Sequence, residues 1–268
     1  MRRCGAACAL LFGLLLGAPG RAAGTAAEPV ELTIYAAASL RDVLQELAPA
    51  VERATGARLV LNLGASSDLA RQILAANRAD VFFSADEDWM DRVAAAGWID
   101  PGSRRAPLAN RLAVVVPADS ALRIAGARDL ASPAIRRLGL ADPAGVPAGK
   151  YARAWLESQG QWAAVAQRVI PALDARAALA AVEIGAVDAG VVYRTDAALS
   201  RRVRVAYLVP EGEGPRIVYA LAALRSRPEL ERSRAVVAWL CGPEAMAVFE
   251  RFGFIASAGA AQDSPSRK

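Results

Sequence analysis

Hydrophobic and polar positions alternate with two different periods from Val30 almost to the end of the chain. Residues 31–35 form a short apolar run typical of a strand, and residues 40–54 repeat apolar side chains every three to four positions, which predicts an amphipathic helix. Further strands are expected at 59–63, 80–84, 111–116, 138–141, 189–193, 203–209 and 217–224, and helices at 69–76, 89–96, 151–158, 175–184 and 233–252. This alternation predicts an α/β fold with largely parallel sheets.

The N-terminal residues of the chain do not follow this alternation of strands and helices. A basic start, Met1 to Arg3, precedes an apolar run over residues 6–18 and a stretch of small residues, which together predict a secretory signal peptide over about residues 1–25. The run is short for a bilayer span, and no stop-transfer pattern follows it, so a retained anchor helix is the less favoured alternative. Cys4 and Cys8 lie before or at the start of the run, which disfavours a lipoprotein. We expect a freely soluble periplasmic protein.

The remaining chain is long enough for two lobes, each with its own core. It contains no repeat and no low-complexity linker, so the lobes should be joined by strand crossings, with hinges near Asn110 and Tyr219. The predicted limits are residues 28–109 plus 221–256 for lobe I, 110–220 for lobe II and 257–268 for a C-terminal tail.

Charge and residue usage exclude several classes of function. The formal net charge of +5 falls to +2 without the leader arginines Arg2, Arg3 and Arg21, which is not the excess typical of a nucleic-acid-binding protein. The chain has no histidine, so it lacks histidine-centred zinc sites and the commonest general base. Cys241 is the one cysteine after the leader, which excludes an intramolecular disulfide.

Short turns connect several predicted strands to the helices that follow them. Ser39 and Asp174 are placed as N-caps, and each such cap taken alone indicates only a helix start. Helix N-termini, however, present free amides and a partial positive charge, and ligands of open α/β sheets bind at the carboxyl ends of strands. Four turns of this kind predict an anion site; they contain Ser39, Ser66 with Ser67, residues 142–149, and Asp174 with Ala175.

Five separated motifs closely resemble those of the periplasmic molybdate-binding proteins of ModA type. They are residues 35–40 (YAAASL), 64–73 (GASSDLARQI), 79–86 (ADVFFSAD), 146–149 (VPAG) and 189–196 (AGVVYRTD). The resemblance extends in order from about residue 31 to residue 254. It implies a two-lobed periplasmic binding protein of type II-like architecture, in which each lobe is a mixed, mostly parallel sheet flanked by helices and the ligand occupies the interlobe cleft.

The resemblance also implies a ligand set. In the family, two serine hydroxyls, two backbone amides at helix starts and one tyrosine hydroxyl hold the oxyanion. Lobe I would supply the serines and lobe II the other groups. The positions that match are Ser39, Ser66, the amide of Ala148, the amide of Ala175 and the hydroxyl of Tyr193. The chain departs from the family pattern at Ala141, Ala175 and Ala220, which affects local turn geometry rather than the donor set.

The implied ligand is molybdate or tungstate, and the implied partner is the membrane permease of an ABC importer. We expect a monomer with no cofactor, no direct metal-cation ligands, no nucleic-acid partner and no enzymatic activity. Molybdate at neutral pH carries no proton, so hydroxyl and amide donors suit it, whereas phosphate keeps a proton and needs an acceptor.

Two alternatives stay open at this point. Another tetrahedral oxyanion such as sulfate would use the same kind of donors. A secreted serine hydrolase using Ser66 is a different class, but the turn lacks the second glycine of a nucleophile elbow and no histidine exists to activate the hydroxyl.

Other signals are weaker. Residues 145–151 imitate a phosphate-binding loop but are one residue short, with Tyr151 in place of the magnesium-binding Ser or Thr. Lys150 either lends its charge to the cleft or is simply solvated. The tryptophans are assigned to the core or the lobe surfaces. A metal cluster is conceivable but capping roles are favoured for Asp80, Asp86, Asp88 and Asp91.

Overall fold

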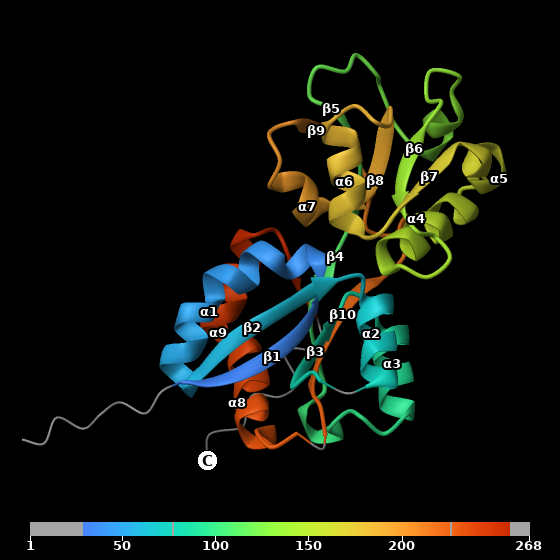
Figure 1. The fold of residues 1–268 in the computed structure, drawn as a ribbon. Coiled ribbons are helices and arrows are strands. Elements are labelled where there is room, and N and C mark those ends of the chain that lie inside the picture. Colours follow the sequence, from blue (N-terminus) through green and yellow to red (C-terminus); the bar gives the residue numbers. More distant parts are fainter. Residues whose placement is uncertain (1–28, 77, 226, 258–268) are drawn as a thin grey trace, which may run out of the picture.

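The computed structural model describes residues 29–76, 78–225 and 227–257. The predicted signal peptide, with Cys4 and Cys8, and residues 258–268 of the predicted tail lie outside the described residues. Two units, each a β-sheet flanked by helices, lie end to end (Figure 1). Within the described ranges, each helix is too short or too polar to cross a bilayer.

The predicted alternation is present, but the structure adds strands at residues 105–110, 169–172 and 255–256 and short helices at residues 162–165 and 194–198. The strands are β1 (Val30–Ala37), β2 (Ala57–Gly64), β3 (Val81–Ser84), β4 (Arg105–Asn110), β5 (Leu112–Pro117), β6 (Leu138–Ala141), β7 (Val169–Ala172), β8 (Ala189–Tyr193), β9 (Val203–Leu208), β10 (Ile217–Ala223) and β11 (Ile255–Ala256). The α-helices are α1 (Arg41–Thr55), α2 (Ser66–Ala75), α3 (Glu87–Ala95), α4 (Pro147–Ser158), α5 (Trp162–Val165), α6 (Ala175–Glu183), α7 (Arg194–Ala198), α8 (Leu230–Leu240) and α9 (Pro243–Arg251). The 3-10 turns are η1 (Ala38–Leu40), η2 (Pro101–Ser103), η3 (Ala127–Ala131) and η4 (Ala166–Arg168).

Lobe I is built on a six-stranded sheet of order β11-β4-β10-β3-β1-β2. Successive side chains of its strands point to opposite faces, so each face carries its own core. Ile34 and Phe83 pack with α1, α8 and α9 on one face, whereas Tyr35 and Phe82 pack with α2 and α3 on the other. This arrangement brings the carboxyl ends of β1, β2 and β3 to the edge of lobe I that faces lobe II (Figure 1).

Lobe II is built on a five-stranded sheet of order β7-β6-β8-β5-β9. Strand β6 runs parallel to β7 and β8, and helices α4 and α6 follow β6 and β7 in the chain. The core on one face of this sheet includes Trp155 of α4, and the core on the other face includes Leu179 of α6. The N-termini of both helices therefore lie at the edge that faces lobe I.

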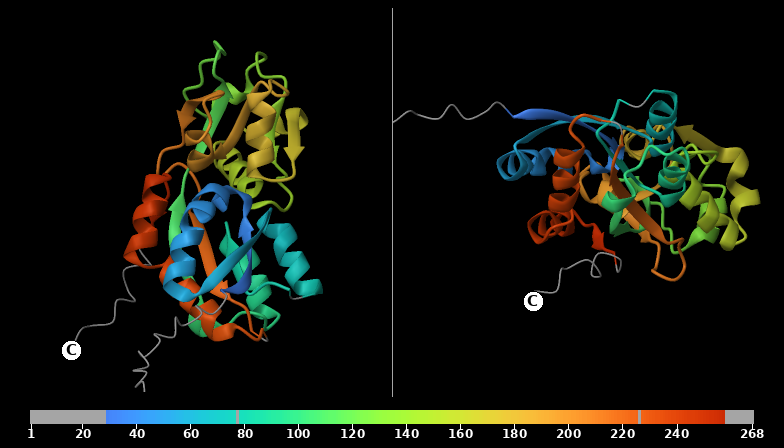
Figure 2. Two further views of the ribbon diagram at one scale, coloured as in Figure 1. Left: turned by 60° about the vertical axis from the view of Figure 1, so that its left-hand side comes forward. Right: turned by 90° about the horizontal axis from the view of Figure 1, so that it is seen from below.

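The chain crosses between the lobes twice, at Arg111 and between β9 and β10. The crossing segments lie side by side, because Ile217 of β10 pairs with Asn110 of β4 (Figure 2). Strand β10 runs through the predicted lobe limit at residues 220 and 221, so the return to lobe I lies upstream of that limit. The detailed limits of the two lobes stay a prediction.

The predicted two-lobed class with mixed sheets is confirmed, but antiparallel pairing has a larger share than expected. Four pairs of named strands are parallel and five are antiparallel. Strand β5 enters lobe II antiparallel to β8 and β9, and β10 returns to lobe I antiparallel to β3 and β4. The crossings account for four of the five antiparallel pairs, since a strand that arrives from the other lobe runs against its new neighbours.

Candidate functional site

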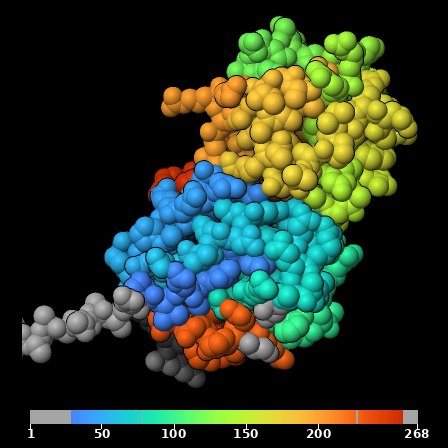
Figure 3. All heavy atoms as spheres, in the orientation of Figure 1, coloured from blue at the N-terminus to red at the C-terminus, as the bar shows by residue number. Residues whose placement is uncertain are grey.

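A small pocket lies between the lobes, where the carboxyl end of the lobe I sheet meets the helix starts of lobe II. It holds about 220 Å³ of empty space, which includes some open solvent at its mouth. Because this volume is an upper bound on the enclosed space, only a small ligand fits in the pocket. The two lobes are in contact along the cleft (Figure 3). The pocket is lined by Ala37, Ala38, Ser39, Gly64, Ala65, Ser66 and Ala85 of lobe I and by Val146, Pro147, Ala148, Asp174, Ala175 and Tyr193 of lobe II.

The structure brings all five predicted site residues together in this pocket, and each is at least 95% buried. Ser39 and Ser66 come from lobe I, and the other three come from lobe II. The residues meet because the turns after β1, β2, β6, β7 and β8 all lie at the interface between the lobes. Their role in binding a ligand stays a prediction.

Ser66 begins α2, directly after the strand β2 and Ala65. Its Oγ accepts a hydrogen bond of 2.9 Å from the backbone N–H of Ala85, which follows β3. A backbone N–H can only donate, so the hydroxyl hydrogen of Ser66 is left free for another partner. The local structure therefore presents Ser66 to the pocket as a donor.

Ser39 does not have the predicted N-cap role. The turn η1 extends the helical region back to Ala38, so Ala37 takes the cap position and no side chain caps the turn. The Oγ of Ser39 instead lies 3.0 Å from the hydroxyl oxygen of Tyr219 on β10. Ser39 thus forms its hydrogen bond with Tyr219, 180 positions away in sequence, rather than with an amide of its own helix.

Ala148 and Ala175 lie in the first turns of α4 and α6. The predicted start of α4 at Tyr151 is wrong by four residues, because Pro147 takes the first helical position, where its missing N–H costs nothing. The first amides of a helix have no intrahelical acceptor and carry the positive end of the helix dipole. Asp174 caps α6 as predicted, accepting a 2.8 Å hydrogen bond from the N–H of Ala177.

Gly149 lets α4 begin against the end of the lobe II sheet. A Cβ on this residue would lie 2.1 Å from the carbonyl oxygen of Ala141 on β6, far inside van der Waals contact. Only glycine allows this approach. The position of the Ala148 amide therefore depends on Gly149.

Tyr193 ends β8, and its hydroxyl is buried with no hydrogen-bond partner in the described part of the chain. Burial raises the pKa of Tyr193 well above its ordinary value, and the neighbouring Tyr219 and Tyr151 add to this effect. The hydroxyl consequently stays protonated at any physiological pH. A buried, unsatisfied donor on the pocket wall is suited to a ligand that brings an acceptor.

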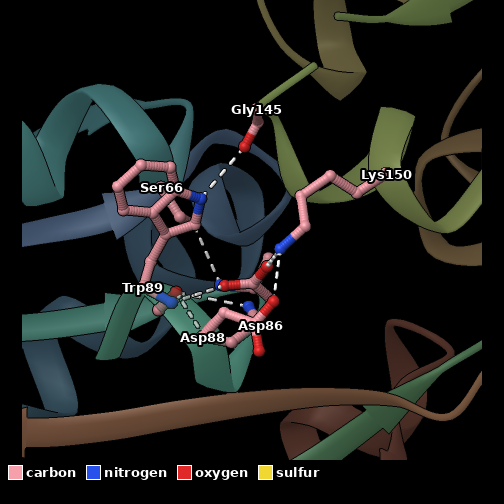
Figure 4. Close-up of polar contacts among 8 residues, drawn as sticks. Ser66, Asp86, Asp88, Trp89, Gly145 and Lys150 are labelled. Atoms are coloured by element: carbon pink, nitrogen blue, oxygen red, sulfur yellow. Dashed lines mark hydrogen bonds and ion pairs between the residues drawn. The ribbon is translucent and has the colours of Figure 1, made fainter. Parts of the chain in front are cut away.

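Polar contacts close the two lobes over one side of the pocket (Figure 4). The indole N–H of Trp89 donates to the carbonyl of Gly145 at 3.0 Å. The Lys150 ammonium lies 2.9 Å from Asp86 and 2.5 Å from Asp88. Burial lowers the pKa of Lys150, but the hydrogen bonds to the two carboxylates outweigh this effect and raise it overall. Lys150 is therefore neither simply solvated nor a wall residue of the pocket.

The four aspartates considered for a metal cluster are each engaged by a protein cation, and Asp86 and Asp88 share Lys150. Asp86 caps α3 by accepting from the N–H of Trp89, as predicted. Asp80 pairs with Arg227 and Asp91 with Arg104. Among the described residues, no group of three or more potential ligands could hold a metal ion.

Arg176 forms a second charged link between the lobes. Located next to Ala175 on α6, it pairs with Asp42 of lobe I and lies 2.8 Å from the carboxylate of Asp196. Asp196 is completely buried, and burial raises its pKa to about 7 although Arg176 opposes the shift. The sequence gives no local signal for this link, which joins residues 134 positions apart.

With this geometry in place, comparison with known proteins identifies the family. Residues 32–255 match the family of bacterial extracellular solute-binding proteins. The chain belongs to this family. Over 232 residues it is 36% identical to the molybdate-binding protein ModA of Escherichia coli K12, covering 85% of this chain and 90% of that protein. The predicted resemblance to the ModA type is confirmed.

Solved structures of solute-binding proteins share the fold. The periplasmic molybdate-binding protein of Azotobacter vinelandii matches with a TM-score of 0.76 and 24% identity, covering 84% of this chain and 98% of that one. The sulfate-binding protein SubI of Mycobacterium tuberculosis H37Rv matches with a TM-score of 0.75 and 19% identity, covering 86% and 88%. At these identities the likeness establishes the two-lobed architecture alone.

The family is one of solute-binding transport proteins and not of enzymes. The geometry around Ser66 gives no support to the alternative of a serine hydrolase. Its Oγ is bonded to the amide of Ala85 and not to a basic side chain. A hydroxyl without a general base is a weak nucleophile.

Proposed function

We propose that the protein captures molybdate, with tungstate as a close analogue, in the periplasm and delivers it to the membrane permease of an ABC importer. One observation carries the proposal: the residues that would supply two serine hydroxyls, two helix-start amides and one tyrosine hydroxyl all line a single small pocket between the lobes. Identity to a protein named for molybdate binding supports the choice of ligand.

The chemistry of the donors favours a proton-free dianion. Ser66 already accepts a backbone hydrogen bond, Tyr193 is held in its protonated form, and the amides can only donate. Among the described residues of the wall, Asp174 alone is charged, and one oxygen of its carboxylate accepts from the N–H of Ala177. The five predicted donors would leave the proton of hydrogen phosphate unbonded, which is costly in a buried site.

The strength of binding expected from this set is high. Hydrogen bonds to a charged group contribute about 1.5–3 kcal/mol each, so five of them reach about the 12 kcal/mol of nanomolar affinity. Groups from both lobes would contact one anion, so binding favours the closed arrangement. The hinge would be the paired crossings at Arg111 and between β9 and β10.

Sulfate is the second candidate, because the fold is shared with a sulfate-binding protein and sulfate also carries no proton. Molybdate and sulfate differ in size. A pocket fitted to the longer molybdenum–oxygen bonds would leave sulfate too far from some donors to form short hydrogen bonds.

Isothermal titration of the mature protein with molybdate, tungstate, sulfate and hydrogen phosphate tests the proposal. We expect tight binding of the first two, weaker binding of sulfate and the weakest binding, measured at high ligand concentration, of hydrogen phosphate. Sulfate binding more tightly than molybdate would replace the proposed ligand. Turnover of generic ester substrates, lost in Ser66→Ala, would instead restore the hydrolase alternative. Light scattering in the same buffers would test the expected monomer.

A further inference from the structure

Behind Ser39, away from the pocket, a line of hydrogen bonds leads to the crossing between the lobes. The N–H of Arg111 donates to Asn110 Oδ1 at 2.9 Å. Asn110 Nδ2 donates to Thr195 Oγ1 at 3.0 Å and to the Tyr219 hydroxyl at 3.2 Å. The Tyr219 hydroxyl lies 3.0 Å from Ser39 Oγ. Asn110, Thr195, Tyr219 and Ser39 are all at least 95% buried, so water does not compete for these groups.

The direction of every hydrogen bond in this line follows from the first one, between Arg111 and Asn110. A backbone N–H can only donate, so the atom of Asn110 that faces Arg111 must be the carbonyl oxygen. The amide nitrogen then faces Tyr219 and donates to it. The Tyr219 oxygen accepts this bond, which leaves its own hydrogen for Ser39. Ser39 therefore accepts from Tyr219, and its hydroxyl hydrogen is left for the pocket.

The opposite direction would leave a buried hydrogen unsatisfied. If Ser39 donated to Tyr219, the Tyr219 oxygen would receive two hydrogens, and its own would have no acceptor among the described residues. Burial raises the pKa of Tyr219 above its ordinary value, so this hydrogen is not lost by ionisation. The ring cannot easily turn away, since it packs edge-on against Phe254 at 5.4 Å and lies 5.9 Å from the ring of Tyr193.

We infer that Asn110 and Tyr219 are positioning residues that fix Ser39 as a hydrogen-bond donor and thereby make the pocket select proton-free oxyanions. Neither residue lines the pocket, so both act through Ser39. The inference rests on the proposed function and adds to it the residues that set selectivity. It also links the pocket to the crossing at Arg111, whose backbone N–H sets the donor direction of the whole line.

A double-mutant cycle tests the inference. Asn110→Asp is nearly isosteric but replaces the donor with an acceptor, so Tyr219 should turn its hydrogen to Asp and Ser39 should lose its donor role. We expect molybdate affinity to fall about 30-fold or more in Asn110→Asp and only about threefold to tenfold in Tyr219→Phe. In the double variant, Asp no longer acts on Ser39, so affinity should return close to that of Tyr219→Phe. Losses that simply multiply would mean that charge alone weakens binding and would overturn the inference.

A selectivity measurement covers the case in which Asn110→Asp does not fold. Without the Tyr219 hydroxyl, Ser39 can rotate and accept the proton of hydrogen phosphate. Tyr219→Phe should therefore shift the ratio of phosphate to molybdate affinity by about tenfold towards phosphate. An equal loss for both ions would indicate a merely structural role.

The matched control for Asn110→Asp is Asn62→Asp, which adds the same charge to lobe I on the partly exposed strand β2.

The wild-type titration separates this inference from the proposed function. If wild type binds sulfate in preference to molybdate, the proposed ligand fails, and the cycle is carried out with sulfate with the same expected pattern. If wild type binds tightly but the cycle is additive, the inference alone fails. A wild-type protein that binds none of the four oxyanions would overturn both.

Discussion

The Lys150 ammonium of lobe II lies 2.9 Å from the carboxylate of Asp86 in lobe I, which is 2% exposed. The second charged link has the same polarity, since Arg176 of lobe II pairs with Asp42 of lobe I. In the described part of the chain, the ion pairs between the two sheet-based lobes thus place cations on lobe II and carboxylates on lobe I. The lobes attract each other before any anion contributes.

Lys150→Met should weaken oxyanion binding by about 1–2 kcal/mol, because the closed form would leave Asp86 buried without its cation. This magnitude is below that of a fully buried pair, since the Lys150 side chain is 30% exposed and partly screened by solvent. Calorimetry at low and high salt would measure it. Wild-type affinity should fall as salt rises, and Lys150→Met should show a shallower dependence.

Arg153→Met is the control for this experiment. Arg153 lies on the same helix but pairs with Glu157 one turn on, within lobe II, and both side chains are 46% exposed. Its loss should leave affinity and salt dependence unchanged. Equal effects of the two variants would contradict a specific role of Lys150 in closure.

Ser39→Ala and Ser66→Ala should each weaken molybdate binding by about 1–3 kcal/mol, since each removes one donor from the pocket. Titration calorimetry would measure the change. Ser67→Ala is a matched control: its hydroxyl is buried next to Ser66 with no partner among the described residues, and it does not line the pocket. Unchanged affinity in both Ser39→Ala and Ser66→Ala would exclude the proposed donor set.

Gly149→Ala should lower both stability and affinity. The added Cβ would collide with the Ala141 carbonyl and push the start of α4, with the Ala148 amide, away from the pocket. We expect a loss of about 1–3 kcal/mol in unfolding free energy and about tenfold or more in affinity, measured by thermal denaturation and titration. Gly145→Ala, where a Cβ meets nothing within 4 Å, should behave as wild type.

Asp196 should make the protein less stable as pH rises from about 4 to about 7. Burial raises its folded-state pKa from 3.8 to about 7, so in this window the native state holds a proton that the unfolded state has released. The free energy of unfolding therefore falls with rising pH, by at most about 1.4 kcal/mol per unit. Asp196→Asn should remove this slope in denaturation measured across the window, whereas Asp119→Asn in an exposed turn should keep it.

Much of the site could be predicted from the sequence because its groups lie at the junctions of strands and helices. Ser66 and Ala175 stand where an apolar run ends and a helical pattern begins, and that position alone places them at the sheet edge. The start of α4 was harder to predict. Pro147 reads as a helix breaker, although at the first helical position it favours the helix.

Contacts between residues far apart in sequence could not be predicted in this way. Tyr219 reaches Ser39 across 180 positions, and no local pattern distinguishes it from an ordinary strand tyrosine. The same holds for the additional role of Trp89, a core residue whose indole N–H donates to Gly145 in the other lobe. Strands β5 and β10 read as buried strands, and a buried apolar run looks the same in parallel and antiparallel pairing.

The place of β10 has a consequence for the order in which the chain folds. This fully buried strand lies between β3 and β4, and its Ala220 pairs with Ser84. All of lobe II therefore precedes, along the chain, the strand that completes lobe I. Until then the backbone edges of β3 and β4 are unpaired, and such edges invite aggregation. Lobe II, whose strands form one continuous stretch, can fold first, while the sheet of lobe I stays incomplete until β10 is added.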